Sequence, residues 1–231
     1  MDRRRARATL TAAFALATLL GLLLHAREYQ FLTDDSYISF RYARNLAEGH
    51  GLVFNPGFER VEGYTNLLWV LVLAAGPVVG VAPEAAAIGL GYGLTVVLWA
   101  LVCWFAYGEA RSRNAPWLCL LAPTMLVATR SVAVWSTGGL ETRLFEVLVL
   151  GALLRQIVEV RAVAHDPIRP VRHWAAALFS LATLTRPDAL LIAGCSMTAA
   201  WGWLAVRRFR RGQYSERVRA DLRHAGADAV I

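Results

Sequence analysis

The sequence predicts an all-α fold: a polytopic membrane helix bundle of about six transmembrane helices, with one re-entrant or interfacial helix in its first outer loop. Three observations predict it. Hydrophobic residues make up 57% of the chain and charged residues 18%, which is more apolar surface than a soluble domain of this length needs. The apolar residues fall in long runs, and several reach the ~20 residues that a helix needs to cross hydrocarbon. The arginines are gathered between these runs, as membrane orientation requires.

One of the apolar runs is a poor candidate for a straight span. It carries Pro77 near its middle, with Gly76 and Gly80 beside it, and proline and glycine interrupt helices. A second run is short for a crossing. We therefore count six spans and place the interrupted run in the membrane interface or as a re-entrant segment. The runs cover, in order, 9–26, 66–82 (interrupted), 85–107, 117–135, 142–160, 174–185 (short) and 189–206.

Arginine sets the predicted orientation. All 24 basic side chains are arginine, which together with the excess of alanine and leucine is typical of a high-GC bacterial gene. If the basic N-terminus lies in the cytoplasm and 66–82 does not cross, every arginine-rich loop falls on the cytoplasmic side. The expected location is a bacterial inner membrane, with residues 1–206 as the transmembrane domain. Cytoplasmic segments are then 108–116, 161–173 and a basic tail at 207–231, and outer segments are 27–84, 136–141 and a turn at 185–188.

Other interpretations of the composition were weighed. Residues 1–26 could be a signal peptide, although the apolar stretch is long for one. The net charge of +7 would suggest an anionic partner in a soluble protein, but no basic and aromatic stripe predicts nucleic-acid binding. The three cysteines all fall inside apolar runs, so we expect no disulfide, and the histidines show no helical metal spacing.

Three polar motifs meet on the predicted outer side. They are the acid pair Asp34-Asp35 with the segment after it, the stretch from Gly138 to Glu141, and the turn from Thr185 to Asp188. Arg130 lies near the outer end of its span. Polar groups that converge from separate segments are what a functional site needs.

The segment after the acid pair is predicted to be helical. Asp34, Ile38, Arg41 and Asn45 fall on one helical stripe, and Arg44 lies next to it. A carboxylate and a guanidinium along one face suit a reaction that takes up a proton and stabilises a departing phosphate. The alternative is that the acids only cap the helix and complement its dipole.

Further polar residues follow in the first outer loop. Glu62, Tyr64 and Asn66 could line a sugar site. The alternative is a solvated loop that Tyr64 and Trp69 anchor among the lipid headgroups.

The other two motifs also have two interpretations each. Glu141 and Asp188 could belong to the site, or could simply begin the helices that follow them. Arg186 could reach a phosphate. Two pairs inside one span, Arg143 with Glu146 and Arg155 with Glu159, are interpreted as structural ion pairs.

Taken together, these motifs resemble polytopic bacterial glycosyltransferases of the type C fold, above all the terminal arabinofuranosyltransferases. The likeness covers roughly residues 8–206, so this region is expected to be part of a glycosyltransferase-like domain. The stretches that carry it are 34–46 (DDSYISFRYARNL), 49–52 (GHGL), 62–66 (EGYTN), 139–141 (GLE) and 186–188 (RPD).

The resemblance implies a membrane enzyme with a polyprenyl-phosphate sugar as donor and a cell-envelope glycan or lipid as acceptor. It implies that Asp34, with Asp35 as alternative or partner, acts as general base, and that polyprenyl phosphate leaves with inversion. Some relatives in the wider superfamily need a divalent metal, so Mg²⁺ or Mn²⁺ is left open. The candidates for binding the phosphate, chosen on geometry, are Arg41, Arg44, Arg130 and Arg186.

Members of that family are usually much longer, so this chain is expected to be an N-terminal portion. One alternative is therefore a truncated, non-catalytic membrane protein of the same ancestry. Another is a transporter or flippase, but the sequence shows no internal repeat and its acids lie at the membrane surface rather than at the midplane.

Overall fold

The computed structural model describes residues 3–115, 117–165 and 173–227, and within these ranges it is all α-helical. This confirms the all-α part of the predicted fold class. Arg169 and Arg172 of the predicted cytoplasmic loop lie outside the described residues. The helices are α1 (Arg3–Glu28), α2 (Ser36–Ala47), α3 (Leu67–Val78), α4 (Pro83–Ser112), α5 (Leu118–Ala128), α6 (Arg130–Val134), α7 (Thr142–His165), α8 (Trp174–Thr185) and α9 (Ala189–Ala227).

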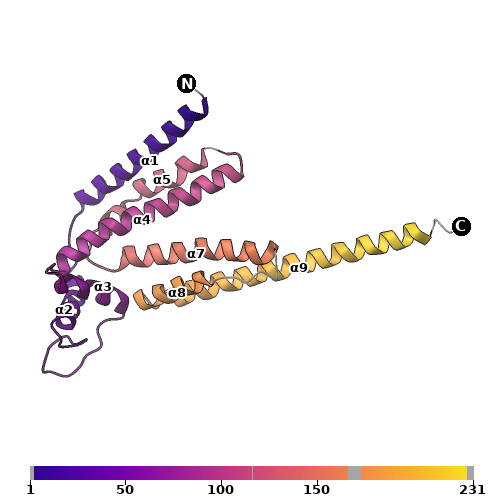
Figure 1. Cartoon of the computed structure of the whole chain (residues 1–231). Coiled ribbons are helices and arrows are strands. Elements are labelled where there is room, and N and C mark those ends of the chain that lie inside the picture. The colour runs from indigo at the N-terminus through magenta and orange to yellow at the C-terminus, as the bar shows by residue number, and fades with distance from the viewer. Residues whose placement is uncertain (1–2, 116, 166–172, 228–231) are drawn as a thin grey trace.

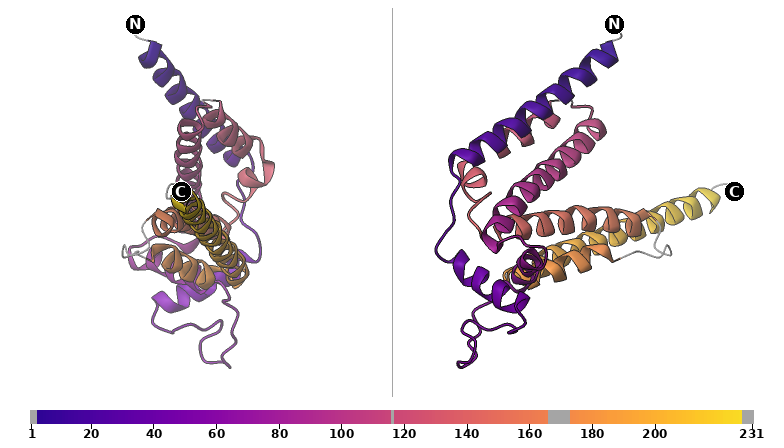
Figure 2. Two further views of the ribbon diagram at one scale, coloured as in Figure 1. Left: turned by 90° about the vertical axis from the view of Figure 1, so that its right-hand side faces the viewer. Right: turned by 60° about the vertical axis from the view of Figure 1, so that its left-hand side comes forward.

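The long helices form two arms that diverge from one end of the molecule (Figures 1 and 2). One arm contains α1, α4 and α5, and the other contains α7, α8 and α9; α4 and α7 pack against each other and join them. The short helices α2 and α3 lie at the end where the arms meet. All three segments that the sequence analysis places on the outer side gather at this end, as predicted.

Among the residues that the structure describes, three helices are long and apolar enough to cross a membrane: Thr9–Glu28, Pro83–Ser112 and Ala189–Arg210. The predicted count of six is not confirmed. Helices α5 and α8 have 11 and 12 residues, so each is about 18 Å long against a hydrocarbon core of about 30 Å. Helix α7 has 24 residues, which is long enough for a crossing, but it carries two ion pairs and is not one of the three.

Those ion pairs are the two that the sequence predicts in this span. Arg143 binds Glu146 and is buried, and its Nε also donates a weaker hydrogen bond to the carbonyl of Trp135. Arg155 donates from Nε to Glu159 over 3.0 Å. Pairing lowers the cost of holding these charges among apolar helices.

The prediction of one helix over 117–135 is wrong. Helix α5 ends at Ala128, Thr129 is extended with φ −81° and ψ 101°, and α6 begins at Arg130. The Thr129 hydroxyl donates to the carbonyl of Met125, a local bond that competes with helical hydrogen bonding. Val127 lies in the last turn of α5, where carbonyl groups have no donor from within the helix. His25 Nδ1 of α1 donates to the Val127 carbonyl oxygen over 3.2 Å.

Helices α2 and α3 form a short hairpin with its own core. Phe40 and Tyr42 of α2 pack with Trp69 and Leu73 of α3, and all four side chains are almost completely buried. Burial of each such side chain contributes roughly 1.5–3 kcal/mol. Helix α3 has 12 residues and ends at a turn in which Gly80 has φ +78°. It is too short to cross a bilayer, as expected for the interrupted run.

Helix α9 continues through the predicted boundary at residue 206 as one helix of 39 residues. It extends beyond the ends of α7 and α8 (Figure 1). The last residues of the predicted basic tail, 228–231, lie outside the described part of the chain.

The contact between α4 and the segment before α7 predicts the effect of a small substitution. A Cβ at Gly91 would lie 2.0 Å from the carbonyl oxygen of Ser136, so Gly91→Ala should cost about 1–3 kcal/mol through overpacking, although alanine is the better helix former. Gly93→Ala is the matched control, because no atom lies within 4 Å of its Cβ. Unfolding in a graded detergent mixture measures both variants; equal stabilities would contradict the close contact.

Candidate functional site

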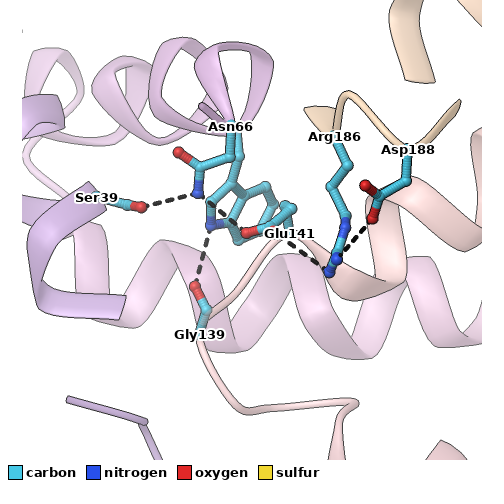
Figure 3. Close-up of polar contacts among 7 residues, drawn as sticks. Ser39, Asn66, Gly139, Glu141, Arg186 and Asp188 are labelled. Atoms are coloured by element: carbon cyan, nitrogen blue, oxygen red, sulfur yellow. Dashed lines mark hydrogen bonds and ion pairs between the residues drawn. The ribbon is translucent and has the colours of Figure 1, made fainter. Parts of the chain in front are cut away.

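Five side chains from four parts of the chain form a continuous polar chain at the end where the arms meet (Figure 3). Asn66, at the start of α3, donates from Nδ2 to Ser39 Oγ of α2 over 2.9 Å and to Glu141 Oε2 over 3.0 Å. Glu141 Oε1 lies 3.7 Å from Arg186 Nη1. Arg186 then donates from Nη2 to Asp188 Oδ2 over 2.9 Å.

The polar chain runs from the protein interior to its surface. Asn66 is 8% exposed, the Glu141 side chain 12% and the Asp188 side chain 66%. The buried amide and carboxylate satisfy each other, which removes most of the cost of burying them. Arg186 also lies over the ring of Phe145, with its Cζ 5.5 Å from the ring centroid. The outer half of the chain, Arg186 and Asp188, is the part that a ligand can reach.

Hydrogen bonds to its backbone carbonyls hold the segment before Glu141 against α3 and against the residue Thr33, which lies just before α2. Trp69 Nε1 donates to the carbonyl of Gly139 over 3.0 Å, and Thr33 donates from its backbone N and its hydroxyl to the carbonyl of Gly138. Gly139 has φ +84°, and a Cβ there would lie 2.8 Å from the side chains of Leu32 and Ser36. Only glycine fits this position without strain.

Asp34 and Asp35 lie directly after Thr33, at the entrance of α2, and both are exposed. Neither carboxylate has a hydrogen bond or an ion pair with any residue that the structure describes. Asp35 occupies the position before α2 but forms no side-chain cap, and the Ser36 hydroxyl instead donates to the carbonyl of Thr33. The capping role considered for this pair is therefore not observed.

The four predicted phosphate-binding arginines contact four different parts of the chain. Arg41 donates to the Phe54 carbonyl and stacks on the ring of the same residue. Arg44 donates to Glu84 at the start of α4 over 2.9 Å. Arg130 lies 5.0 Å from the ring centroid of Tyr29. Among the four, Arg186 is the one that joins the polar chain.

The predicted sugar-site residues of the first loop also separate. Asn66 is part of the polar chain. Tyr64 is half-buried and packs edge-on against Tyr42 with ring centroids 5.0 Å apart. Glu62 is exposed and has no polar partner among the residues described. The structure brings Asn66, Glu141, Arg186 and Asp188 together, and it leaves Glu62 at the surface.

Two residues of this region were not predicted. Ser39 receives a hydrogen bond from Asn66, and its signal was present: Ser36, Ser39 and Ala43 place small residues along one face of α2, where another segment can approach closely. Trp69 was considered as a headgroup anchor. It is instead 1% exposed and bound to Gly139, so that alternative is wrong for Trp69.

The metal left open by the sequence finds no complete ligand set in the described ranges. No three side chains among His, Cys, Asp and Glu gather there in a way that could hold an ion. The adjacent carboxylates of Asp34 and Asp35 are two side chains without a third ligand beside them among the described residues, so no chemistry is assigned to a metal.

Comparison with known proteins finds one similarity. A stretch of 88 residues is 35% identical to the terminal beta-(1->2)-arabinofuranosyltransferase of Mycobacterium tuberculosis (strain ATCC 25618 / H37Rv). It covers 38% of this chain and 14% of that relative, so the chain matches a small part of a much longer protein. No family description and no solved structure matches. Over this stretch of 88 residues, the similarity supports the resemblance to arabinofuranosyltransferases that the motifs predict.

The polar chain predicts that Asn66 and Glu141 stabilise the protein jointly. In a double-mutant cycle, Asn66→Ala and Glu141→Ala should show a coupling of about 1–2 kcal/mol, because either change removes one hydrogen bond from the other, largely buried group. Asn66→Ala combined with Arg111→Ala, at the far end of α4, should be additive. Reversible unfolding in detergent measures both cycles. A coupling near zero for the first pair would mean that this hydrogen bond is not formed.

Proposed function

We propose that this chain is part of a membrane glycosyltransferase of the type C fold. It transfers a sugar from a polyprenyl-phosphate donor to a cell-envelope glycan or lipid on the outer face of the membrane. The observation that carries the proposal is the acid pair: Asp34 and Asp35 are exposed and unpaired beside the segment that holds Glu141. The similarity to an arabinofuranosyltransferase and the three membrane-length helices support it.

Asp34 is proposed as the general base, with Asp35 as its partner or alternative. The acceptor hydroxyl gives its proton to the Asp34 carboxylate while its oxygen attacks the anomeric carbon of the donor sugar. The bond from that carbon to the phosphate oxygen breaks, and polyprenyl phosphate leaves with both bonding electrons and with inversion. An exposed carboxylate without a partner is free to accept this proton. Glu141 is engaged by Asn66 and Arg186, which suits a supporting role.

Arg186 is the proposed cation for the departing phosphate. Its side chain is 43% exposed, and its guanidinium lies between Glu141 and Asp188. A phosphate can displace the exposed Asp188 and accept two hydrogen bonds, while Glu141 keeps the guanidinium oriented. Arg41, Arg44 and Arg130 remain candidates, but their partners are Phe54, Glu84 and Tyr29, which are not part of the polar chain.

The remaining polar residues are proposed to contact sugar hydroxyl groups. Asp188, once released by Arg186, can accept hydrogen bonds from the donor sugar. Glu62 and Tyr64 follow α2 in the first loop and are proposed to contact the acceptor. The prenyl tail of the donor stays in the bilayer beside the apolar helices, so the sugar is presented at the membrane surface where the acid pair lies.

The first test is loss of the proposed base. Asp34→Asn should lower the rate of sugar transfer from a polyprenyl-phosphate donor by about 10²–10⁴-fold, since it removes the proton acceptor. Asp35→Asn is measured alongside to decide between the two acids. Glu28→Gln, an exposed carboxylate at the end of α1, is the control and should leave the rate unchanged. Unchanged turnover in both aspartate variants, with normal membrane insertion, would remove the acid pair from the mechanism.

The second test is orientation. In a background without Cys103, Cys119 and Cys195, single cysteines replace three exposed residues, Asp35, Ser112 and Asp188. An impermeant maleimide added to intact cells should label Asp35→Cys and Asp188→Cys, and should label Ser112→Cys only after the membrane is opened. The reverse pattern would put the acid pair in the cytoplasm, away from envelope acceptors.

A further inference from the structure

Two apolar cavities lie on either side of α7, near the ends of the helices opposite to the polar chain. The α7/α9 cavity has a volume of about 430 Å³ and is lined by apolar residues such as Val160, Ala200 and Trp203. The α4/α7 cavity has a volume of about 260 Å³ and lies against the aromatic residues of α4. Ile157 and Arg161 line both cavities.

The shared residues place one cation between two apolar spaces. Ile157 and Arg161 are four residues apart on α7, so they lie one above the other on the same helix face. They form the ridge that separates the cavities. A ligand with two apolar chains and one anionic head fits this arrangement, with a chain on each side of Ile157 and the head at Arg161.

The charges around Arg161 also favour an anion. Its side chain is 68% exposed and lies 3.6 Å from Glu109, which binds Arg113 more closely, over 2.8 Å. Arg207 of α9 lies over the ring of Trp203, with its Cζ 5.0 Å from the ring centroid. Two guanidinium groups, those of Arg113 and Arg161, therefore share the single carboxylate of Glu109, and the local charge is positive.

The position of these groups along the helices matches the headgroup level of a bilayer. Glu109 lies in the last turn of the membrane-length helix Pro83–Ser112, and Trp203 and Arg207 lie near the end of Ala189–Arg210. Tryptophan and arginine are enriched at membrane interfaces, and basic pockets between transmembrane helices bind anionic headgroups.

We propose that an anionic diacyl phospholipid binds astride α7, with one acyl chain in each cavity and its phosphate at Arg161. A polyprenyl phosphate has the same head chemistry but a single chain, which would leave one cavity empty. The proposal depends on insertion of the helices in a membrane and not on sugar transfer, so it can fail while the proposed function stands.

Native mass spectrometry of the chain released from nanodiscs tests the site. With equal amounts of phosphatidylglycerol and phosphatidylcholine, we expect one retained phosphatidylglycerol per chain. Arg161→Gln should weaken its binding about tenfold, the effect of one charge-assisted contact. Arg111 lies in the last turn of α4, as Glu109 does, but borders neither cavity. The control variant Arg111→Gln should therefore have no effect. Ala200→Trp fills the α7/α9 cavity and should abolish retention.

Four outcomes would overturn the proposal. They are equal retention of the two lipids, no retained lipid, an unchanged affinity in Arg161→Gln, and displacement of phosphatidylglycerol by an equimolar polyprenyl phosphate. The last would assign the cavities to a single-chain donor. Because Arg161 is exposed, Arg161→Gln is expected to fold, and its circular dichroism spectrum checks that it remains helical. This variant therefore tests the proposal even if Ala200→Trp is unstable.

Discussion

The hydrogen bonds that hold residues 137–141 against α2 and α3 are the constraint on which the rest of the structure depends. This segment leads into α7 and so belongs to the second arm, whereas α2 follows directly from α1 of the first arm. Trp69 and Thr33 bind the carbonyls of Gly139 and Gly138, and Asn66 binds Glu141. Buried polar groups must find partners, so these bonds fix where the two arms meet. They also place the acid pair next to the polar chain, because Asp34 follows Thr33 directly.

The end of the molecule where the arms meet contains two kinds of polar residue. The buried Ser39 and the largely buried Glu141 both accept hydrogen bonds from the buried Asn66, and the three act as a scaffold. Asp34 and Asp35 stand outside that scaffold and keep their carboxylates free. In the proposed function, the reacting carboxylates stay in water while more deeply buried groups set the geometry of the site. Arg186 lies at the edge of the scaffold, since its partner Glu141 is largely buried and its other partner, Asp188, is exposed.

Much of the fold and part of the site could be predicted from the sequence. The apolar runs located most of the helices, and the distribution of arginine brought the three polar motifs to one end. Periodicity could not reveal the break at Thr129, because it depends on a local threonine bond and on His25, more than a hundred residues earlier. It could not reveal the partners of the arginines either. Arg44 binds Glu84, which is 40 residues away in the sequence. An arginine side chain is long and flexible, so its partner is whichever carboxylate the tertiary packing brings close to it.

The turn between α8 and α9 has a mechanical consequence. Helix α9 has 39 residues and no break, so it forms a rod about 58 Å long. Its first turn adjoins Asp188, the partner of Arg186. A tilt of about 5° at this turn displaces the distant end of the rod by about 5 Å. A small change of direction at this turn would therefore move the far end of α9 by several ångströms without any helix having to unwind.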